Sequence, residues 1–260
     1  RSSKVIDFNV KVDNKGLSHR LCVVFDSQIV SAFNYADQQF GLIKRPNYYE
    51  KEMKLYMESM NNRSEKKTGI QELANWANDQ STWQEPPISI EPTQSYISLT
   101  DGKTGVAVIP QGVREYEVLD DSKIRLTLFR TYGFMGKENL IYRPGRASGE
   151  RIIETPAAQL LKQMEFNFGF TTYAGDINDA DIDTLAKQYD TNMEVYTYAE
   201  FLNGRLIFSQ REIEGKNDIV HSLFETEGNL VVSAIKKAEE DDGYIIRLYN
   251  GKDHRNLDDK

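Results

Sequence analysis

The chain has 260 residues, of which 39% are hydrophobic and 11% aromatic, a composition typical of a globular protein with a substantial core. Its formal net charge of -8 and its isoelectric point near 5.1 argue against binding to nucleic acid or to an anionic membrane surface. The longest apolar runs, Leu21–Phe25 and Leu230–Ile235, are far shorter than the roughly 20 residues that a membrane span needs.

The first segments alternate between apolar and polar residues, as strands do. Residues 5–12 alternate at a period close to two, Asn14-Lys-Gly16 can turn the chain, and residues 18–25 form a second apolar run. This pattern predicts a β-hairpin. The single cysteine, Cys22, lies in the second run, and we expect a small buried side chain. Because it cannot form an internal disulfide, it favours a cytoplasmic location.

Residues 95–129 repeat the strand pattern and predict an antiparallel meander. Its turns are expected at Asp101-Gly102 and at Asp120-Asp121, both of which have typical turn chemistry. Two long excursions interrupt the strands. Residues 61–84 are mostly polar, and residues 136–155 contain Arg143-Pro-Gly-Arg-Ala-Ser-Gly149, whose proline and glycines argue against a regular strand or helix.

One helix is predicted over residues 179–189, because Ile182, Leu185, Ala186 and Tyr189 share a face and Asn178 or Asp179 can cap the start. A short helical turn is expected from Thr155-Pro156. Further strands are predicted over residues 165–173, 193–202, 205–210, 230–236 and 244–249. The predominance of short strands predicts an all-β protein, a large antiparallel β-sandwich with one or two short helices in connections.

Residues that could carry chemistry are sparse. His19, His221 and His254 stand apart, without the spacing of metal ligands, and adjacent acids such as Asp120 and Asp121 are common in solvated turns. The sequence therefore predicts no catalytic residue and no metal site in this chain. Arginine, aromatic and glycine residues gather instead in the loop segments 40–46, 83–86 and 142–149.

Several of these segments, taken in order, resemble the C-terminal region of glycoside hydrolase family 38. They are Phe40-Gly-Leu-Ile-Lys-Arg-Pro46, Trp83-Gln-Glu-Pro86, residues 96–109 followed by Gly112 and Tyr116-Glu117, Leu126-Thr-Leu-Phe-Arg130, the 143–149 loop, and residues 232–239 with 246–250. The 143–149 loop is similar to that of bacterial, mannosylglycerate hydrolase-like members. Where the family continues with a Thr-His-x-Asn-type stretch, this chain has Asn47-Tyr-Tyr-Glu50.

The resemblance implies a supersandwich of the galactose mutarotase type. Residues 1–260 would be the C-terminal β region of a larger enzyme, with sub-layers 1–150 and 151–260. The family members are retaining, zinc-dependent α-mannosidases whose zinc ligands and nucleophilic Asp lie in an upstream α/β domain, introduced by His-x-Asp. No histidine here is followed two places later by aspartate. Zinc is therefore expected in that other domain, and no cofactor is expected in this chain.

On this hypothesis the chain braces the catalytic domain of an enzyme that hydrolyses terminal α-mannosides, and it is inactive alone. Arg143, Arg146 and Tyr142 are the expected substrate contacts, because a guanidinium can bind two sugar hydroxyls or a carboxylate. The alternatives are a carbohydrate-binding sandwich that uses Trp76 and Trp83, and a structural or oligomerising domain. The expected partners are the α-mannoside, the catalytic domain and, through open sheet edges, a second copy of the chain.

Overall fold

The computed structural model describes residues 4–65, 86–136, 138–140, 143–146, 152–191 and 230–250. The expected strands at residues 193–202 and 205–210 lie outside the described residues. The elements are β1 (Ile6–Asp13), β2 (Arg20–Asp26), β3 (Phe33–Gln38), β4 (Gly41–Pro46), α1 (Glu50–Glu65), β5 (Glu91–Pro92), β6 (Ile97–Thr100), β7 (Thr104–Gln111), β8 (Glu115–Leu119), β9 (Lys123–Arg130), β10 (Phe134–Met135), β11 (Glu138–Leu140), β12 (Arg143–Arg146), β13 (Ile153–Glu154), the 3-10 turn η1 (Pro156–Gln159), β14 (Gln163–Ala174), α3 (Ile182–Asp190), β15 (Leu230–Lys237) and β16 (Tyr244–Asn250).

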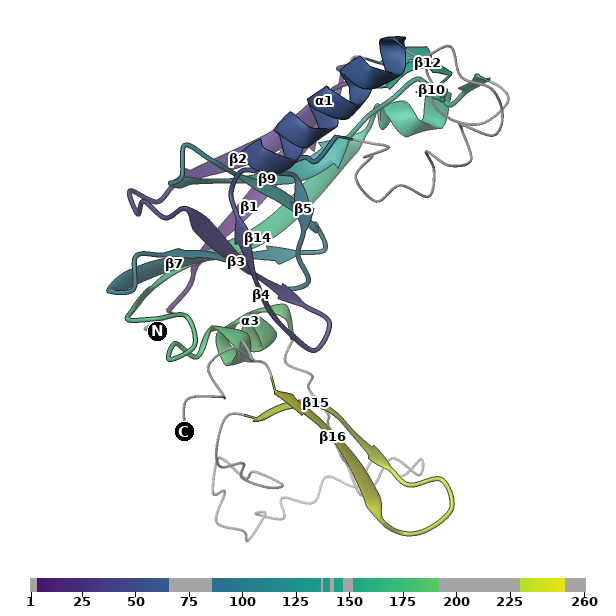
Figure 1. The fold of residues 1–260 in the computed structure, drawn as a ribbon. Helices are drawn as coiled ribbons and strands as arrows, with labels where there is room; N and C mark the ends of the chain where they lie inside the picture. The colour runs from purple at the N-terminus through teal and green to yellow at the C-terminus, as the bar shows by residue number, and fades with distance from the viewer. Residues whose placement is uncertain are drawn as a thin grey trace, which may run out of the picture.

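Two antiparallel sheets form the centre of the molecule (Figure 1). The larger sheet has the strand order β1-β14-β7-β6-β3-β4, and the smaller has the order β2-β9-β8-β5. Alternate side chains of both sheets meet in one apolar core that includes Ile97, Val108, Tyr116, Leu126 and Phe168. Because side chains alternate across a strand, this packing leaves one outer face on each sheet. The predicted all-β sandwich is confirmed.

The predicted hairpin of residues 5–12 and 18–25 is wrong. β1 pairs with β14, and Phe8 lies opposite Phe168. β2 pairs instead with β9 in the other sheet. Both strands were located correctly, but the turn at residues 14–16 carries the chain from one sheet to the other. Phe25 of β2 packs on Phe8 of β1 at 5.6 Å between ring centroids, so the two runs meet across the core.

The predicted meander over residues 95–129 is divided in the same way. β6 pairs with β7 in the larger sheet, and β8 pairs with β9 in the smaller. Both predicted turns are present: Gly102 has φ +85°, and Asp120 and Asp121 have φ of +50° and +54°. Gly112, with φ +82°, stands where the chain crosses between the sheets.

α3 forms a partial third layer on the outer face of the larger sheet (Figure 1). Ile182 and Ala186 are buried against Tyr96 and Ile109, and Leu185 and Tyr189 complete the contact. The predicted helix is thus confirmed, although it begins at Ile182 and its N-cap residue, Asp181, makes no side-chain cap hydrogen bond. η1 confirms the helical turn predicted at Thr155-Pro156.

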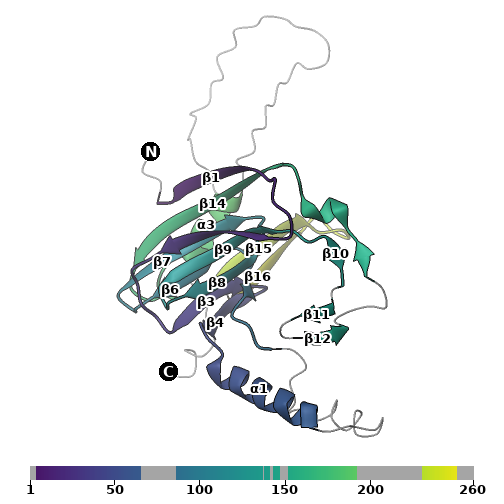
Figure 2. The same cartoon turned by 90° about the horizontal axis from the view of Figure 1, so that it is seen from above.

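α1 was not predicted. Its 16 residues are mostly polar, so the sequence shows no apolar stripe. Its last residues belong to the segment that we expected to be a surface excursion. Tyr56 is its buried contact, with 2% of its surface exposed. Figure 2 shows α1 projecting from the side of the sandwich. None of the described helices is long and apolar enough to cross a membrane.

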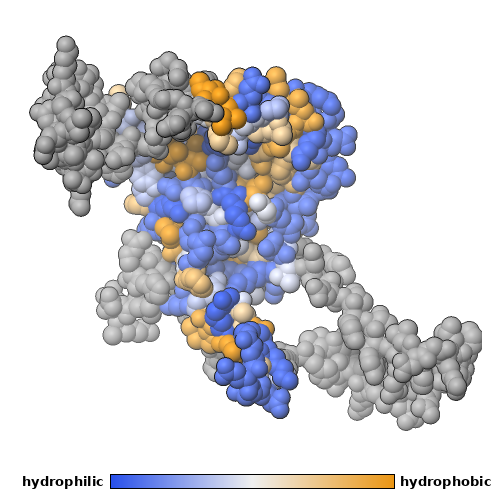
Figure 3. Space-filling view, turned by 90° about the vertical axis from the view of Figure 1, so that its right-hand side faces the viewer, coloured by the Kyte–Doolittle hydropathy of each residue, from blue (hydrophilic) through white to orange (hydrophobic). Residues whose placement is uncertain are grey.

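Three small hairpins complete the described structure. β10 pairs with β13, and β11 pairs with β12, both beside the main sheets (Figure 2). β15 pairs with β16 beyond α3, at the opposite end of the molecule from β12 (Figure 1). Figure 3 shows hydrophobic side chains gathered at that lower end. Residues of this hairpin with 40–51% of their surface exposed are Leu230, Ile235, Ile245, Ile246 and Leu248.

Candidate functional site

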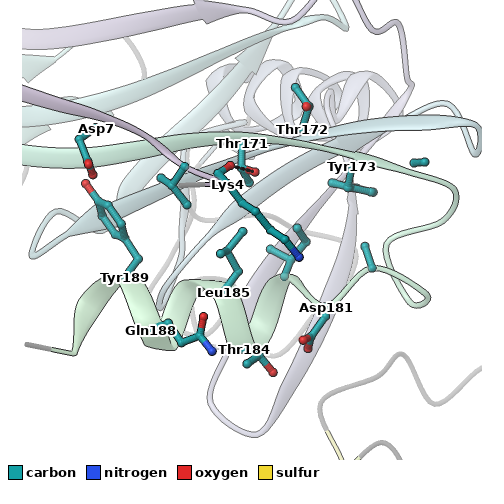
Figure 4. Close-up of a pocket in the computed structure, with 14 residues that line it drawn as sticks. Lys4, Asp7, Thr171, Thr172, Tyr173, Asp181, Thr184, Leu185, Gln188 and Tyr189 are labelled. Carbon is teal, nitrogen blue, oxygen red and sulfur yellow. Dashed lines mark hydrogen bonds between the residues drawn. The ribbon is translucent and has the colours of Figure 1, made fainter. Parts of the chain in front are cut away.

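A cleft of about 750 Å³ lies between α3 and the outer face of the larger sheet (Figure 4). β1 contributes Asp7, β14 contributes Thr171 and Tyr173, and α3 contributes Leu185 and Tyr189. α3 packs on β7 through a cluster that includes Ile182, Ala186 and Ile109, and the cleft lies beside this contact. Val5 and Ile182, which are both buried, close its floor.

Tyr189 and Asp7 close one end of this cleft, and Figure 4 shows the two side chains pointing toward one another. Burial raises the pKa of Tyr189, and its hydrogen bond to the Asp7 carboxylate adds to the increase. Gly169 makes room for this arrangement. A Cβ at residue 169 would lie 2.5 Å from Val5 Cγ1 and 3.1 Å from the Tyr189 ring.

A pair of carboxyl groups lies on a different side of α3. Asp37 of β3 and Asp183 of α3 are both largely buried, and the hydroxyl of Tyr96 donates a 3.2 Å hydrogen bond to Asp183 Oδ1. Burial raises the pKa of Asp183 to about 6, and the Asp37 carboxylate adds to this increase. Burial also raises the pKa of Asp37, although a hydrogen bond from Ser95 opposes the shift.

Lys187 links this acid pair to the β15–β16 hairpin. Its ammonium group donates a 3.3 Å hydrogen bond to the carbonyl of Val232 and lies 5.0 Å from the ring centroid of Tyr249. Burial lowers the pKa of Lys187, and the charges of Asp183 and Asp37 oppose that shift. The cluster therefore attaches the hairpin to the sandwich.

Two carboxyl groups could in principle act as a glycosidase pair, which requires about 5 to 10 Å between them with a sugar held in the gap. Neither Asp37 nor Asp183 lines the cleft. Asp37 instead accepts a hydrogen bond from Ser95 and Asp183 accepts one from Tyr96, and the charge of Lys187 acts on both. The pair is therefore suited to holding α3 and the hairpin in place rather than to acid–base catalysis on a sugar.

The Phe-Gly-x-x-x-Arg-Pro segment belongs to a buried polar network between β4, β5 and β8. Arg45 Nη1 donates to the carbonyl of Pro92 at 3.0 Å and to the Tyr116 hydroxyl at 3.1 Å. Arg45 Nε lies 3.6 Å from a carboxylate oxygen of Glu91, which also accepts a 2.7 Å hydrogen bond from Tyr49. The arginine is thus satisfied by protein groups and joins the two sheets.

Asn47 stands where the broader family pattern has another residue type, and it extends this network. Only 2% of its surface is exposed. Its amide donates to the carbonyl of Ser31 at 2.6 Å and to Asp121 at 2.9 Å, and it accepts a 2.9 Å bond from Asn34. The departure from the family pattern therefore has a structural role here.

The outer face of the smaller sheet carries a row of ion pairs. Glu117, with 5% of its surface exposed, pairs with Arg20 and Arg125. Glu115 accepts hydrogen bonds from Arg130 at 2.7–3.0 Å. These charges neutralise one another on the sheet, so the face offers fixed ion pairs rather than free arginines to a ligand.

The predicted substrate contacts lie far from all of these clusters. The structure places the backbone of Arg143 and Arg146 on β12, where residue 146 pairs with Glu138 and residue 143 with Leu140. The prediction that the glycine and proline of this segment prevent a strand is wrong. The hairpin accommodates them through a register irregularity between residues 138 and 140. Tyr142 lies outside the described residues.

The remaining candidates from the sequence have varied environments. His19 Nδ1 lies 3.2 Å from Thr131 Oγ1, and its ring packs edge-on against Phe129. Cys22 is not the buried apolar side chain that we expected, because it is partly exposed and accepts a 3.0 Å hydrogen bond from Arg20 Nε. His221, His254, Trp76 and Trp83 lie outside the described residues. Among the described residues, no group of three or more histidine, cysteine or acidic side chains could hold a metal ion.

The fold and these clusters describe a β-sandwich domain in which a buried polar network around Arg45 and Asn47 joins the two sheets. Comparison with known proteins assigns the family. Residues 1–134 match the model of the glycosyl hydrolases family 38 C-terminal domain, which is just over half of the chain. The chain belongs to this family, and the resemblance found in the sequence is confirmed.

Individual relatives agree with this assignment. The chain is 25% identical over 253 residues to a protein of Halalkalibacterium halodurans described as "Putative mannosylglycerate hydrolase". Its fold is similar to that of an alpha-mannosidase from Enterococcus faecalis V583 (TM-score 0.65, 20% identity) and of a glycosyl hydrolase family 38 protein from Enterococcus faecalis (TM-score 0.62, 18% identity). The alignments cover 96–97% of this chain but only 22–23% of those proteins.

Proposed function

We propose that this chain is the non-catalytic C-terminal β domain of a retaining, zinc-dependent α-mannosidase that hydrolyses terminal α-mannosides. Membership of the family 38 C-terminal domain is the observation that carries the proposal. The names of the relatives support the substrate class, and the small share of their length that this chain spans leaves room for a separate catalytic domain.

The role proposed for this chain is to brace that catalytic domain. A rigid sandwich suits the role, because the Arg45 and Asn47 network joins the two sheets and the ion pairs of Glu117 link three strands of the smaller sheet. Zinc would be bound by the catalytic domain. The described residues of this chain provide no suitable ligand cluster for it, so no step of the reaction is assigned to them.

The β11–β12 hairpin is proposed to reach the rim of the substrate pocket. Its arginines are suited to the task because a planar guanidinium can donate two parallel hydrogen bonds to neighbouring sugar hydroxyls or to the carboxylate of an acidic aglycone such as glycerate. Arg143 and Arg146 flank the Pro-Gly pair of β12, and Tyr142 precedes them. A hairpin beside the main sheets can carry such residues without disturbing the core.

The test uses the full-length enzyme with an α-mannoside substrate. Arg146→Ala and Arg143→Ala should each lower kcat/KM by about tenfold or more, chiefly through a higher KM, with the circular dichroism spectrum unchanged. Arg247→Ala is the matched control, because β16 lies at the opposite end of the molecule from β12 (Figure 1). Unchanged kinetics in both hairpin variants would remove β12 from the substrate site.

A second measurement tests whether this chain alone lacks catalytic activity. Residues 1–260 alone should release no mannose from an α-mannoside, with or without added zinc. Zinc-dependent turnover by this chain alone would contradict the proposal that it is the non-catalytic part. The same assay applied to the full-length enzyme, before and after treatment with a chelator, checks the zinc requirement itself.

A further inference from the structure

We propose that the cleft between β14 and α3 is a binding site for a neutral saccharide. The inference goes beyond the bracing role and does not depend on it, because the residues that carry it are all within this chain. No described residue of the β11–β12 hairpin lines the cleft.

The dimensions of the cleft suit a small ligand. Its volume of about 750 Å³ is within the range of roughly 300 to 1,000 Å³ that is common for small-molecule sites. The cleft is bounded by β1, β14 and α3, three elements that pack together through buried side chains. The walls are therefore already formed before any ligand binds, which reduces the entropic cost of binding.

The lining of the cleft has an apolar floor and a polar rim. Val5, Ile182 and Leu185 provide aliphatic surface at the floor. The rim carries hydroxyl, amide and carboxylate groups that can donate to or accept from a ligand; they belong to Asp7, Asp181, Thr184 and Gln188. A sugar ring has the matching chemistry, because its C–H face is apolar and its hydroxyl groups lie around the edge.

The charges on the cleft disfavour anionic ligands. Asp7 and Asp181 contribute two negative charges, and Lys4 contributes one positive charge. Figure 4 shows Asp7 and Asp181 at opposite ends of the cleft, with Lys4 extending into the space between them. The net negative charge disfavours phosphate or a sugar acid, and the ammonium group of Lys4 already supplies a positive charge near the two carboxylates. A neutral polyol can donate hydroxyl hydrogen bonds to both carboxylates and accept one from Lys4.

Neighbouring contacts hold Asp7, the backbone at Lys4 and the end of α3 in place. Thr171 Oγ1 donates a 2.7 Å hydrogen bond to the carbonyl of Lys4, which ties the start of the chain to β14. The Tyr189 hydroxyl donates to Asp7, and Gln111 holds the end of α3 through a 3.0 Å hydrogen bond to the carbonyl of Tyr189. Fixed polar groups around an aliphatic floor favour one orientation of a ring-shaped ligand.

The experiment is a titration of this chain with methyl α-D-mannopyranoside, followed by two-dimensional amide NMR. We expect saturable shifts confined to amides around Thr172, Thr184 and Gln188, and no such shifts with inorganic phosphate or glycerate. The absence of saturable shifts, shifts centred elsewhere, or equal shifts with phosphate would each overturn the proposal. None of these results would bear on the kinetics of the full-length enzyme.

Variants give a second, independent readout. Asp181→Asn and Gln188→Ala should each weaken binding by about fivefold, because the first replaces a charged acceptor with a weaker neutral one and the second removes the hydrogen-bonding amide. Neither side chain is buried, and Asp181 makes no cap hydrogen bond, so both variants should fold. Asp179→Asn is the matched control, since Asp179 is exposed and does not line the cleft. Binding that is unchanged in both variants, or equally weakened in the control, would contradict the proposed site.

Discussion

Tyr173 of β14 lies directly opposite Gly105 of β7, and its ring covers the face of the glycine. A Cβ at residue 105 would overlap that ring. The Tyr173 hydroxyl is fixed in turn by a 2.6 Å hydrogen bond with Ser98 on the next strand. A cross-strand pair of this kind lets one aromatic side chain bridge three strands of the larger sheet on the face that α3 covers.

Gly105→Ala should therefore lower the free energy of unfolding by about 1–3 kcal/mol, because the Tyr173 ring must move and its bond to Ser98 must lengthen. Urea denaturation measures the change. Gly41→Ala is the control, because no atom lies within 4 Å of the corresponding Cβ position and its φ is not positive. If both substitutions lower the free energy of unfolding by the same amount, the contact between Tyr173 and Gly105 does not contribute to stability.

The raised pKa of Asp183 predicts how stability depends on pH. In the folded chain its pKa is about 6, compared with an ordinary value of 3.8, so between these values the folded state binds more protons than the unfolded state. The stabilisation is complete below pH 4 and is lost as pH rises through 6. Asp183→Asn should remove this loss and raise the free energy of unfolding at pH 7 by an amount on the order of 2 kcal/mol.

Denaturation at several pH values between 4 and 7 measures this effect. The variant should still show part of the dependence, because burial raises the pKa of Asp37 as well. Asp179→Asn, an exposed position in the loop before α3, controls for the change in net charge. A steeper loss of stability in Asp183→Asn than in the original chain would show that the carboxylate stabilises α3 instead.

Glu117 should be the most sensitive position in the ion pairs of the smaller sheet. Glu117→Ala removes the partner of both Arg20 and Arg125, and it should lower the free energy of unfolding by about 2 kcal/mol. Asp120→Asn removes the charge of the exposed pair with Lys123, keeps a residue type that tolerates the positive φ of this turn, and should have a much smaller effect. Thermal melts of the two variants measure the difference. Equal losses of stability would contradict the expectation that the buried ion pairs matter more than the exposed one.

Tyr116→Phe tests the network around Arg45. The substitution removes a 2.6 Å hydrogen bond to Asn34 and leaves Arg45 without one of its acceptors, in a region where Tyr116 is fully buried. A loss of about 1–3 kcal/mol is expected in urea denaturation. Tyr48→Phe is the control, because 43% of the surface of Tyr48 is exposed. If the Tyr116→Phe variant is as stable as this control, the network around Arg45 does not stabilise the fold.

The local patterns in the sequence were sufficient to locate most strands and the α3 helix. Alternation located β14, and the spacing of Ile182, Ala186 and Tyr189 located α3, because burial on one face imposes a fixed period on the sequence. The turn residues Asp101-Gly102 and Asp120-Asp121 were also identified correctly, since few residue types tolerate positive φ. α1 was missed because its sequence is mostly polar and shows no apolar stripe at helical spacing.

The cleft and the acid pair could not have been predicted from the sequence. Asp37 and Asp183 are 146 residues apart, and no spacing rule connects them. The lining of the cleft likewise combines residues from β1, β14 and α3. The sequence shows the carboxylates, but with 40 acidic residues in the chain it does not indicate which two lie together.

The sequence by itself determined the class of fold and the family, because both depend on local periodicity and on short motifs that keep their order along the chain. The tertiary structure decided which strands pair. Residues 5–12 and 18–25 looked like a hairpin, but each pairs with a distant strand in a different sheet. The physical reason is that a strand presents the same backbone hydrogen-bonding groups to every neighbour, so the choice of partner depends on which side chains fill the shared core.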